Sequence, residues 1–157
     1  MRILVISDSH RRTSAVEKII ESQPDARHIF FLGDNVSDIE DFDFIYSDRV
    51  FHTVCGNCDF GSMLATSGVE IIEGKRIFYT HGHTFFVKYG ISKLKELARN
   101  NNYDIVLYGH THISQILYED GIYFVNPGSA AAARQGRNSY AVIDITEKGI
   151  MPIIIDL

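Results

Sequence analysis

Small groups of Asp, Asn and His recur along the chain, each directly after a short apolar run. The groups are Ser7-Asp8-Ser9-His10, Gly33-Asp34-Asn35, Cys55-Gly56-Asn57-Cys58-Asp59, Thr80-His81-Gly82-His83 and Gly109-His110-Thr111-His112. Carboxylate, amide and imidazole groups are typical ligands of divalent metal ions in hydrolytic sites. Five of the seven histidines lie in these groups. We therefore interpret the joint pattern as a metal centre, although each group alone would be ordinary turn chemistry.

The apolar runs that precede these groups predict the strands that position them. They are Ile3–Ile6, Ile29–Leu32, Val50–Val54, Ile77–Tyr79 and Ile105–Tyr108. Short continuous runs of this kind are typical of strands buried on both faces. Ligand sites of α/β sheets lie outside the carboxyl ends of the strands. We therefore expect one rim to gather Asp8, His10, Asp34, Asn57, His81, His110 and His112.

The remaining pattern predicts helices and hairpins around these strands. Helices are expected at 14–22, where Ser14-Ala15-Val16-Glu17 reads as a capping box, at 92–100, and within 35–46. Turns at Glu73-Gly74-Lys75, Asp120-Gly121 and Glu147-Lys148-Gly149 predict hairpins, with the last strands at 140–145 and 150–155. The expected fold class is α/β, with two mixed β-sheets packed as a sandwich and flanked by helices.

Composition narrows the classes of function. The 157 residues fit one domain, 1–157, and are 45% hydrophobic and 22% charged, as in an ordinary globular protein. Fifteen Lys and Arg against twenty Asp and Glu give a net charge of −5, which disfavours strong nucleic-acid binding or a basic membrane-binding surface. No apolar run reaches the ~18 residues of a membrane span, and the N-terminus does not read as a signal peptide. With only two Cys, a cytoplasmic location is expected.

The order of the motifs resembles the calcineurin-like metallophosphoesterase family. The resemblance is carried by Asp8-x-His10, Gly33-Asp34, Gly56-Asn57, His81 and Gly109-His110-x-His112, and it extends from residue 4 to about residue 129. The small size and the Asn126-Pro127-Gly128-Ser129 segment resemble the short bacterial and archaeal phosphodiesterase branch of that family. The resemblance implies a metal-dependent phosphoesterase, most simply a phosphodiesterase acting on a small phosphodiester substrate.

The resemblance also implies a ligand set and a mechanism. One metal would be held by Asp8, His10, Asp34 and His112, and a second by Asp34, Asn57, His81 and His110. A hydroxide bridging the two divalent ions would attack phosphorus. Manganese is the first expectation for the metals, with iron, zinc, nickel or cobalt as alternatives. The residues expected to take part in catalysis are Asp34, Asn57, Cys58, Asp59 and His81.

One position departs from the family pattern. The third motif commonly reads Gly-Asn-His followed by an acid, whereas this chain has Cys58 in place of the His. A thiol is the poorer acid catalyst, so phosphodiesters with good leaving groups are the expected substrates. Asp59 could orient the site or could be an ordinary turn residue.

Two functions of other classes compete with hydrolysis. The first is a non-catalytic interaction or scaffold module that keeps the fold, but the unbroken ligand set argues against it. The second is a thiol oxidoreductase that uses the Cys-x-x-Cys of Cys55 and Cys58. That reading requires Cys55 to titrate well below ~8.5 and a helix to begin after the pair, which Asp59-Phe60-Gly61-Ser62 does not favour.

Several residues are left open. His83 and four arginines, Arg11, Arg12, Arg134 and Arg137, could contact substrate or could be solvated. His28 and His52 lie outside the motifs and are interpreted as surface or satisfied core residues. The apolar segment 150–155 could belong to the core or to the interface of a homodimer or larger homo-oligomer. The sequence does not identify the natural substrate.

Overall fold

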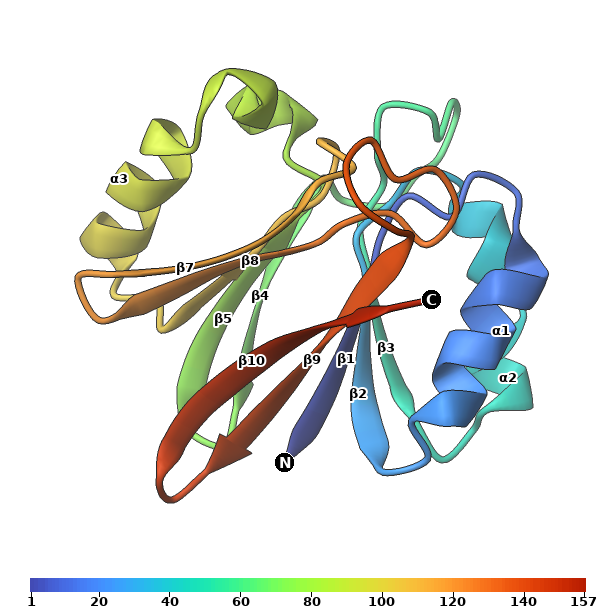
Figure 1. Cartoon of the computed structure of the whole chain (residues 1–157), viewed down its shortest axis with the longest axis horizontal. Coiled ribbons are helices and arrows are strands. Elements are labelled where there is room, and N and C mark those ends of the chain that lie inside the picture. The colour runs from blue at the N-terminus through green and yellow to red at the C-terminus, as the bar shows by residue number, and fades with distance from the viewer.

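The computed structural model describes all residues, 1–157, as two five-stranded mixed β-sheets packed face to face (Figure 1). The first sheet contains β1 (Arg2–Ile6), β2 (Ala26–Phe31), β3 (Val50–Thr53), β9 (Ser139–Thr146) and β10 (Gly149–Asp156), in the order β10-β9-β1-β2-β3. The second contains β4 (Ser67–Ile72), β5 (Lys75–Thr80), β6 (Ile105–Leu107), β7 (Ser114–Glu119) and β8 (Ile122–Pro127), in the order β4-β5-β6-β8-β7. The predicted α/β sandwich is confirmed.

Helices cover the outer faces of the two sheets (Figure 1). The helix α1 (Thr13–Ser22) and the short helix α2 (Phe42–Ile45) lie on the first sheet, and α3 (Ser92–Asn101) lies on the second. Short 3₁₀ helices occur at Val36–Ile39, His83–Phe85 and Val87–Tyr89. The predicted helices and hairpins are therefore present, with ends displaced by at most a residue or two. None of the helices has the length and apolar composition needed to cross a lipid bilayer.

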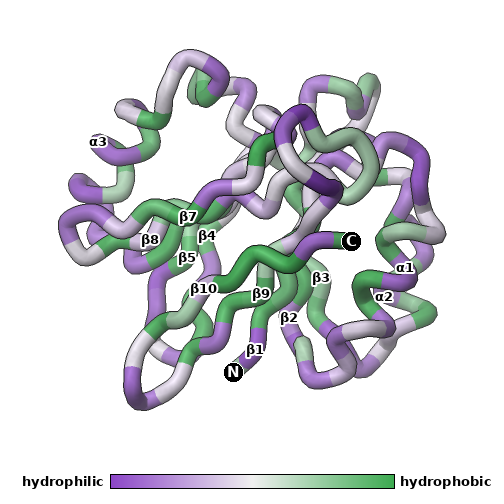
Figure 2. The backbone as a smooth tube through the Cα atoms, viewed as in Figure 1, coloured by the Kyte–Doolittle hydropathy of each residue, from purple (hydrophilic) through white to green (hydrophobic).

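The alternation of side chains along β1 explains why the layers stay together. Ile3 and Val5 point into the layer between the sheets, while Leu4 and Ile6 pack against α1, and all four are fully buried. Each such side chain contributes roughly 1.5–3 kcal/mol by leaving water. Hydrophobic residues accordingly follow the inner strands in Figure 2, and hydrophilic ones follow the turns. A strand buried on both faces holds the loop that follows it in a fixed place.

The predicted capping box is wrong. The helix α1 begins at Thr13, its N-cap is Arg12, and no side chain caps it. The hydroxyl of Thr13 instead donates to Oδ1 of buried Asp38, 3.1 Å away in the segment that follows β2. A tertiary contact has therefore replaced the local cap that the sequence pattern indicated. The amphipathic character was predicted correctly, because Val16, Ile19 and Ile20 form the buried face.

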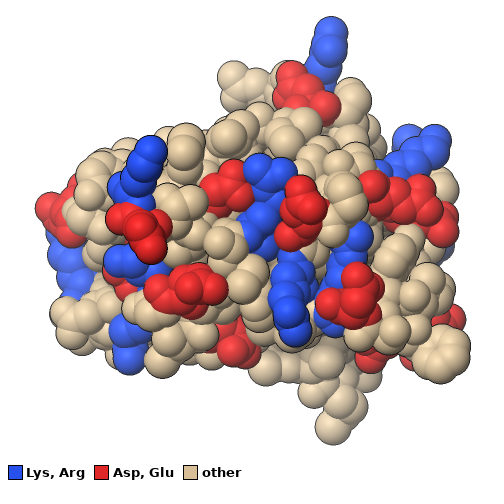
Figure 3. Space-filling view, turned by 90° about the horizontal axis from the view of Figure 1, so that it is seen from below, with Lys and Arg blue, Asp and Glu red and all other residues tan.

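Parallel pairing brings the functional loops to one rim. The strands β1, β2 and β3 pair in parallel, as do β5, β6 and β8, so the loops that follow them gather at the top of Figure 1. On the opposite face, seen from below in Figure 3, Lys and Arg are interspersed with Asp and Glu. That face therefore shows no patch of a single charge.

Candidate metal centre

The loops at this rim carry every predicted ligand. Asp8 and His10 follow β1, Asp34 follows β2, Asn57 follows β3, His81 follows β5, and His110 and His112 follow β6. His10 and His112 are 102 positions apart in sequence, yet their Nε2 atoms lie 3.2 Å apart. The structure thus brings together all the residues that the motifs singled out.

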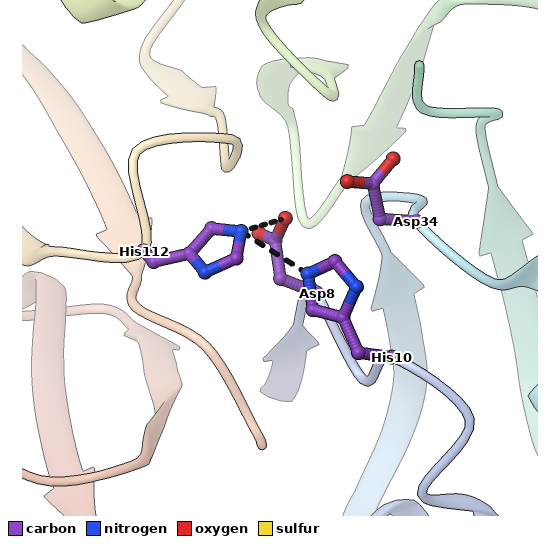
Figure 4. A group of neighbouring side chains, drawn as sticks. All are labelled: Asp8, His10, Asp34 and His112. Atoms are coloured by element: carbon purple, nitrogen blue, oxygen red, sulfur yellow. Dashed lines mark hydrogen bonds and ion pairs between the residues drawn. The ribbon is translucent and has the colours of Figure 1, made fainter. Parts of the chain in front are cut away.

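A first group consists of Asp8, His10, Asp34 and His112, whose candidate ligand atoms lie within 4.8 Å of one another (Figure 4). Nε2 of His112 lies 3.1 Å from Oδ1 of Asp8. Both carboxylates are buried, and both imidazoles are half-buried. Four oxygen and nitrogen ligands at this spacing are enough to hold one divalent cation.

A second group consists of Asp34, His81 and His110, again within 4.8 Å of one another. Nε2 of His81 lies 3.1 Å from Nδ1 of His110, 3.5 Å from Oδ1 of Asp34 and 3.2 Å from Oδ1 of Asn57. Asn57 therefore completes this group with an amide oxygen. Because Asp34 belongs to both groups, its carboxylate lies between two candidate cation positions.

Backbone hydrogen bonds determine which nitrogen of two histidines carries the proton. Nδ1 of His81 lies 2.7 Å from the carbonyl oxygen of Leu32, and Nδ1 of His112 lies 2.8 Å from that of Ala132. A carbonyl oxygen only accepts, so Nδ1 donates and Nε2 of the neutral ring carries a lone pair. Each Nε2 therefore points its lone pair at a carboxylate and at another imidazole nitrogen. Such converging electron pairs fit a bound cation, and a backbone-anchored imidazole is usual for a metal ligand.

Asp8 gives a second, independent indication of a cation. Its Oδ2 accepts hydrogen bonds from the Ser7 hydroxyl and from the backbone N–H of His110, whereas buried Oδ1 lies 3.1 Å from Nε2 of His112, which can donate to it only when that imidazole is protonated. Burial raises the pKa of Asp8, but the hydrogen bonds of His112 and Ser7 and the charge of His81 hold that pKa below its ordinary value. With His112 neutral, this charged and buried oxygen has no donor, which is costly unless a cation binds it.

The electrostatics also keep the other ligands ready for a metal. Burial, followed by the charges of His81 and Lys88, lowers the pKa of His110 to about 4. His110 is therefore neutral near pH 7, as a ligand must be. The pKa of His112 is raised, mainly by its hydrogen bond to Asp8. A proton on His112 would thus compete with a cation in acid.

Backbone strain is concentrated in this centre. Asp8, His10, Asp34, His110 and His112 have left-handed φ angles of 55°, 45°, 61°, 67° and 59°. Such a conformation costs a non-glycine residue on the order of 1 kcal/mol and is typical of functional sites. These tight turns direct the side chains at the strand ends toward the centre. The sequence did not reveal this left-handed backbone conformation.

Two glycines allow the loops to approach so closely. A Cβ atom on Gly56 would overlap the carboxylate of Asp34, and one on Gly109 would overlap the hydroxyl of Ser7. Each glycine directly precedes a ligand, Asn57 in one case and His110 in the other. Glycine therefore precedes Asn57 and His110 because a larger residue would overlap the neighbouring loop.

Residues 1–148 match the model of the calcineurin-like phosphoesterase superfamily domain. The chain belongs to this family. The phosphodiesterase YfcE of Escherichia coli K12 is 30% identical to it over 168 residues, which cover 92% of this chain and 88% of that protein. The crystal structure of a predicted phosphoesterase from Streptococcus pneumoniae TIGR4 superposes with a TM-score of 0.84 at 27% identity, covering 99% of this chain and 88% of that one.

The same fold occurs in Vps29, a protein whose name does not describe a phosphoesterase. Vps29 of Entamoeba histolytica, crystallised in complex with Zn²⁺, superposes with a TM-score of 0.74 at 24% identity, and the match covers 99% of both chains. This likeness concerns the fold. The family that the motifs indicated is confirmed by the match of residues 1–148 to its model.

Asp59 in this phosphoesterase has the contacts of a positioning residue. Its carboxylate accepts four backbone N–H groups, from Asp34 at 2.9 Å, Asn35 at 2.7 Å, Val36 at 2.8 Å and Gly56 at 2.7 Å. It therefore ties the loop after β2 to the loop after β3. The sequence left open whether Asp59 orients the site or only shapes a turn, and these bonds favour the orienting role.

The two cysteines do not resemble a redox pair. Both are free, and buried Cys55 directs its Sγ to the carbonyl oxygen of Leu64 at 3.1 Å. Burial, followed by the charge of Asp59, raises the pKa of Cys55. Burial, followed by a hydrogen bond to Asp34, raises the pKa of Cys58 to about 11. The thiol oxidoreductase hypothesis required a lowered pKa, so the structure argues against it.

The other candidate residues, which are His83, the four arginines and the segment 126–129, occupy different positions relative to the centre. The ring of His83 lies 5.4 Å from that of His81, and its buried Nδ1 has no hydrogen-bond partner. Arg11 lines a cleft beside the centre, whereas the side chains of Arg12, Arg134 and Arg137 form no hydrogen bond or ion pair, although the charge of Arg134 opposes the raised pKa of His112. The segment 126–129 braces the site, because the Ser129 hydroxyl donates to the backbone carbonyl of Asp8 at 2.7 Å. Sequence patterns gave no sign of this bracing role.

Proposed function

We propose that this calcineurin-like phosphoesterase hydrolyses small phosphodiesters with two divalent cations, manganese first among them. One observation carries the proposal. The buried carboxylate of Asp34 is shared by two groups of ligands, and in each group a backbone carbonyl orients one imidazole, His81 or His112, so that its Nε2 lone pair faces the other ligands. Cations bound there would supply the positive charge that phosphoryl oxygens need and would activate the attacking water. The likeness to the phosphodiesterase YfcE supports the reaction class.

The chain's own residues have definable tasks in this reaction. The Nδ1 hydrogen bonds of His81 and His112 hold the imidazoles in the orientation that a cation needs. The backbone N–H of Cys58 donates to Oδ1 of Asp34 at 2.9 Å and so fixes that carboxylate. The thiol of Cys58 remains protonated near pH 7 but is a weak acid, since its pKa is about 11. We therefore expect diesters with good leaving groups to react fastest.

Metal titration tests this proposal. Chelator-stripped protein should not hydrolyse bis(p-nitrophenyl) phosphate, and added Mn²⁺ should restore turnover that saturates near two ions per chain. Calorimetry should find the same two ions independently of activity. Turnover without metal would overturn the proposal, as would saturation with a single ion.

The free thiols agree with a cytoplasmic location, which is part of the same proposal.

The non-catalytic interaction or scaffold module is the second candidate, because the fold also occurs in Vps29, which is not named as an esterase. It predicts metal binding without hydrolysis of any diester or monoester. The same titration separates the two functions, since calorimetry and turnover are measured on one sample.

A further inference from the structure

A large cleft opens directly beside the metal centre. It has a volume of about 1030 Å³, at the upper end of the range for small-molecule sites. Three of its lining residues, Arg11, Asn35 and Cys58, each follow a candidate ligand in the sequence. From there the cleft extends past β3 and β5, where Phe51 and Tyr79 line it. A substrate whose phosphate lies on the metals could therefore place one of its ester groups here.

The charge of the lining argues against a second phosphate. Arg11 is the only Lys or Arg among the lining residues, whereas Glu40, Asp43 and Glu70 contribute three carboxylates. The carboxylate of the remaining acid, Asp59, is occupied by four backbone N–H groups. A further anionic group in this cleft would meet like charge. Carboxylates only accept hydrogen bonds, so a suitable ligand would offer N–H or O–H donors.

One wall of the cleft offers an aromatic surface with no partner in the chain. Phe60 is 92% exposed, and it directly follows Asp59, whose hydrogen bonds fix the start of this loop. The backbone N–H of Ser62 donates to the carbonyl oxygen of Asp59 at 3.2 Å and closes the turn that presents the ring. Flat rings stack on exposed aromatic side chains with useful free energy whatever their hydrogen-bonding pattern.

We propose that the cleft binds one ester arm of the substrate and that this arm is nucleoside-like, a flat ring with N–H and O–H donors and no further phosphate. The ring would stack on Phe60, and the donors would reach Asp43, Glu40 or Glu70. This inference rests on the proposed phosphodiesterase function and adds the substrate class to it.

Competitive inhibition tests the proposal without depending on which arm leaves. The reporter is methyl p-nitrophenyl phosphate hydrolysed by the Mn²⁺-loaded protein, and the inhibitors are thymidine 5′-methyl phosphate and dimethyl phosphate. The nucleoside inhibitor should bind at least tenfold more tightly. Phe60→Ala should reduce that advantage about tenfold, which corresponds to the ~1–3 kcal/mol of one stacked base. Dimethyl phosphate should inhibit this variant and the wild type equally.

A matched control separates stacking from a general loss of surface aromatics. Tyr89 is also 92% exposed but does not line the cleft, so Tyr89→Ala should leave both inhibition constants unchanged. A 3′-phosphate on the nucleoside inhibitor should weaken binding, and Asp43→Asn should restore part of the loss. Equal inhibition by the nucleoside and dimethyl esters would overturn the proposal, as would tighter binding of the 3′-phosphorylated one.

Failure of the proposed function would look different. The Mn²⁺-loaded protein would then leave the reporter intact, and the same pair of inhibitors would be compared by calorimetry. A nucleoside preference that depends on Phe60 would in that case survive the loss of the phosphodiesterase proposal, and its absence would refute the cleft inference itself.

Discussion

Two histidine pairs in this protein have almost the same nitrogen–nitrogen distance and different chemistry. Nε2 of His81 lies 3.1 Å from Nδ1 of His110 at the rim, and Nδ1 of His28 lies 3.0 Å from Nε2 of His52 along β2 and β3. A short distance between imidazole nitrogens therefore does not identify a metal site. The difference lies in what surrounds each pair.

The pair along the strands has a complete hydrogen-bonding chain. His28 can donate from Nδ1 to Nε2 of His52, and Nδ1–H of His52 then faces Oε1 of Glu70 at 3.4 Å. At the rim, Nδ1 of His81 donates to the Leu32 carbonyl, so Nε2 of the neutral ring faces the Asp34 carboxylate and the Asn57 amide oxygen, which cannot donate to it, as well as Nδ1 of His110. The first pair is satisfied within the protein, whereas the second places oxygen acceptors on an imidazole lone pair, an arrangement that a bound cation would satisfy.

Removing the shared carboxylate should give the largest effect. We predict that Asp34→Asn lowers phosphodiester hydrolysis by at least about 10³-fold, because a neutral amide is a poor bridging ligand. This loss exceeds the roughly 10–100-fold that is typical when a residue hydrogen-bonded to a metal ligand is replaced. The protein should remain folded by circular dichroism. The control is Asp48→Asn, the same change at an exposed carboxylate outside the centre, which should keep full activity. Turnover near that of the wild type in Asp34→Asn would contradict the mechanism.

The two histidine pairs can be compared directly by the same substitution in each. We predict that His81→Gln lowers the number of Mn²⁺ ions bound in calorimetry from two to one, with hydrolysis reduced by at least about 10²-fold. His52→Gln should retain both ions and full metal affinity, because its ring contacts Glu70 and Phe30 rather than the centre. Loss of an ion in His52→Gln, or two ions in His81→Gln, would show that the pairs had been distinguished wrongly.

The departure at Cys58 gives a smaller and opposite effect. We predict that Cys58→His raises hydrolysis of alkyl phosphate monoesters, because an imidazole can protonate a poor leaving group where a thiol with a pKa of about 11 cannot. The gain should be about tenfold, below the ~10²–10⁴-fold of established acid–base catalysts, since the loop is not adapted to the new ring. Cys58→Ser is the control, and it should give no gain. Equal monoester rates in all three proteins would leave the departure without functional meaning.

Most of the fold could be predicted because its signals are local. The runs Ile3–Ile6 and Ile105–Tyr108 are apolar, β-branched and short, and they correspond to β1 and β6 within a residue or two. The start of α1 was missed because Thr13 binds Asp38, a partner from another segment that no local pattern contains.

The candidate ligands could be predicted because their residue types and order are distinctive. The contacts that hold these ligands in place could not be predicted from the sequence. The bond from Ser129 to the loop of Asp8 joins residues 121 positions apart, and the four N–H groups on Asp59 depend on how two loops meet. His28 and His52 were correctly read as ordinary residues, yet their mutual contact required the register of β2 against β3.

The pair of His28 and His52 should make the free energy of unfolding depend on pH in mildly acidic solution. Burial is the main cause that lowers the pKa of His52 below its usual 6.5, and the charge of Glu70 opposes it. At pH values between the lowered pKa and 6.5, the unfolded chain binds more protons than the folded one. The free energy of unfolding should therefore fall as the pH drops below about 6.5.

Urea denaturation between pH 7.5 and 5 measures this dependence. His52→Gln lacks the titrating ring, so its free energy of unfolding should fall less steeply with pH than that of the wild type in the same buffers. The metal-centre histidines are the same in both proteins, so the difference between the two curves removes their contribution. His112, whose pKa is raised, acts in the opposite direction and cannot produce the expected loss. Parallel curves would mean that His52 is not desolvated in solution, and the distinction between the two pairs would then rest on the centre alone.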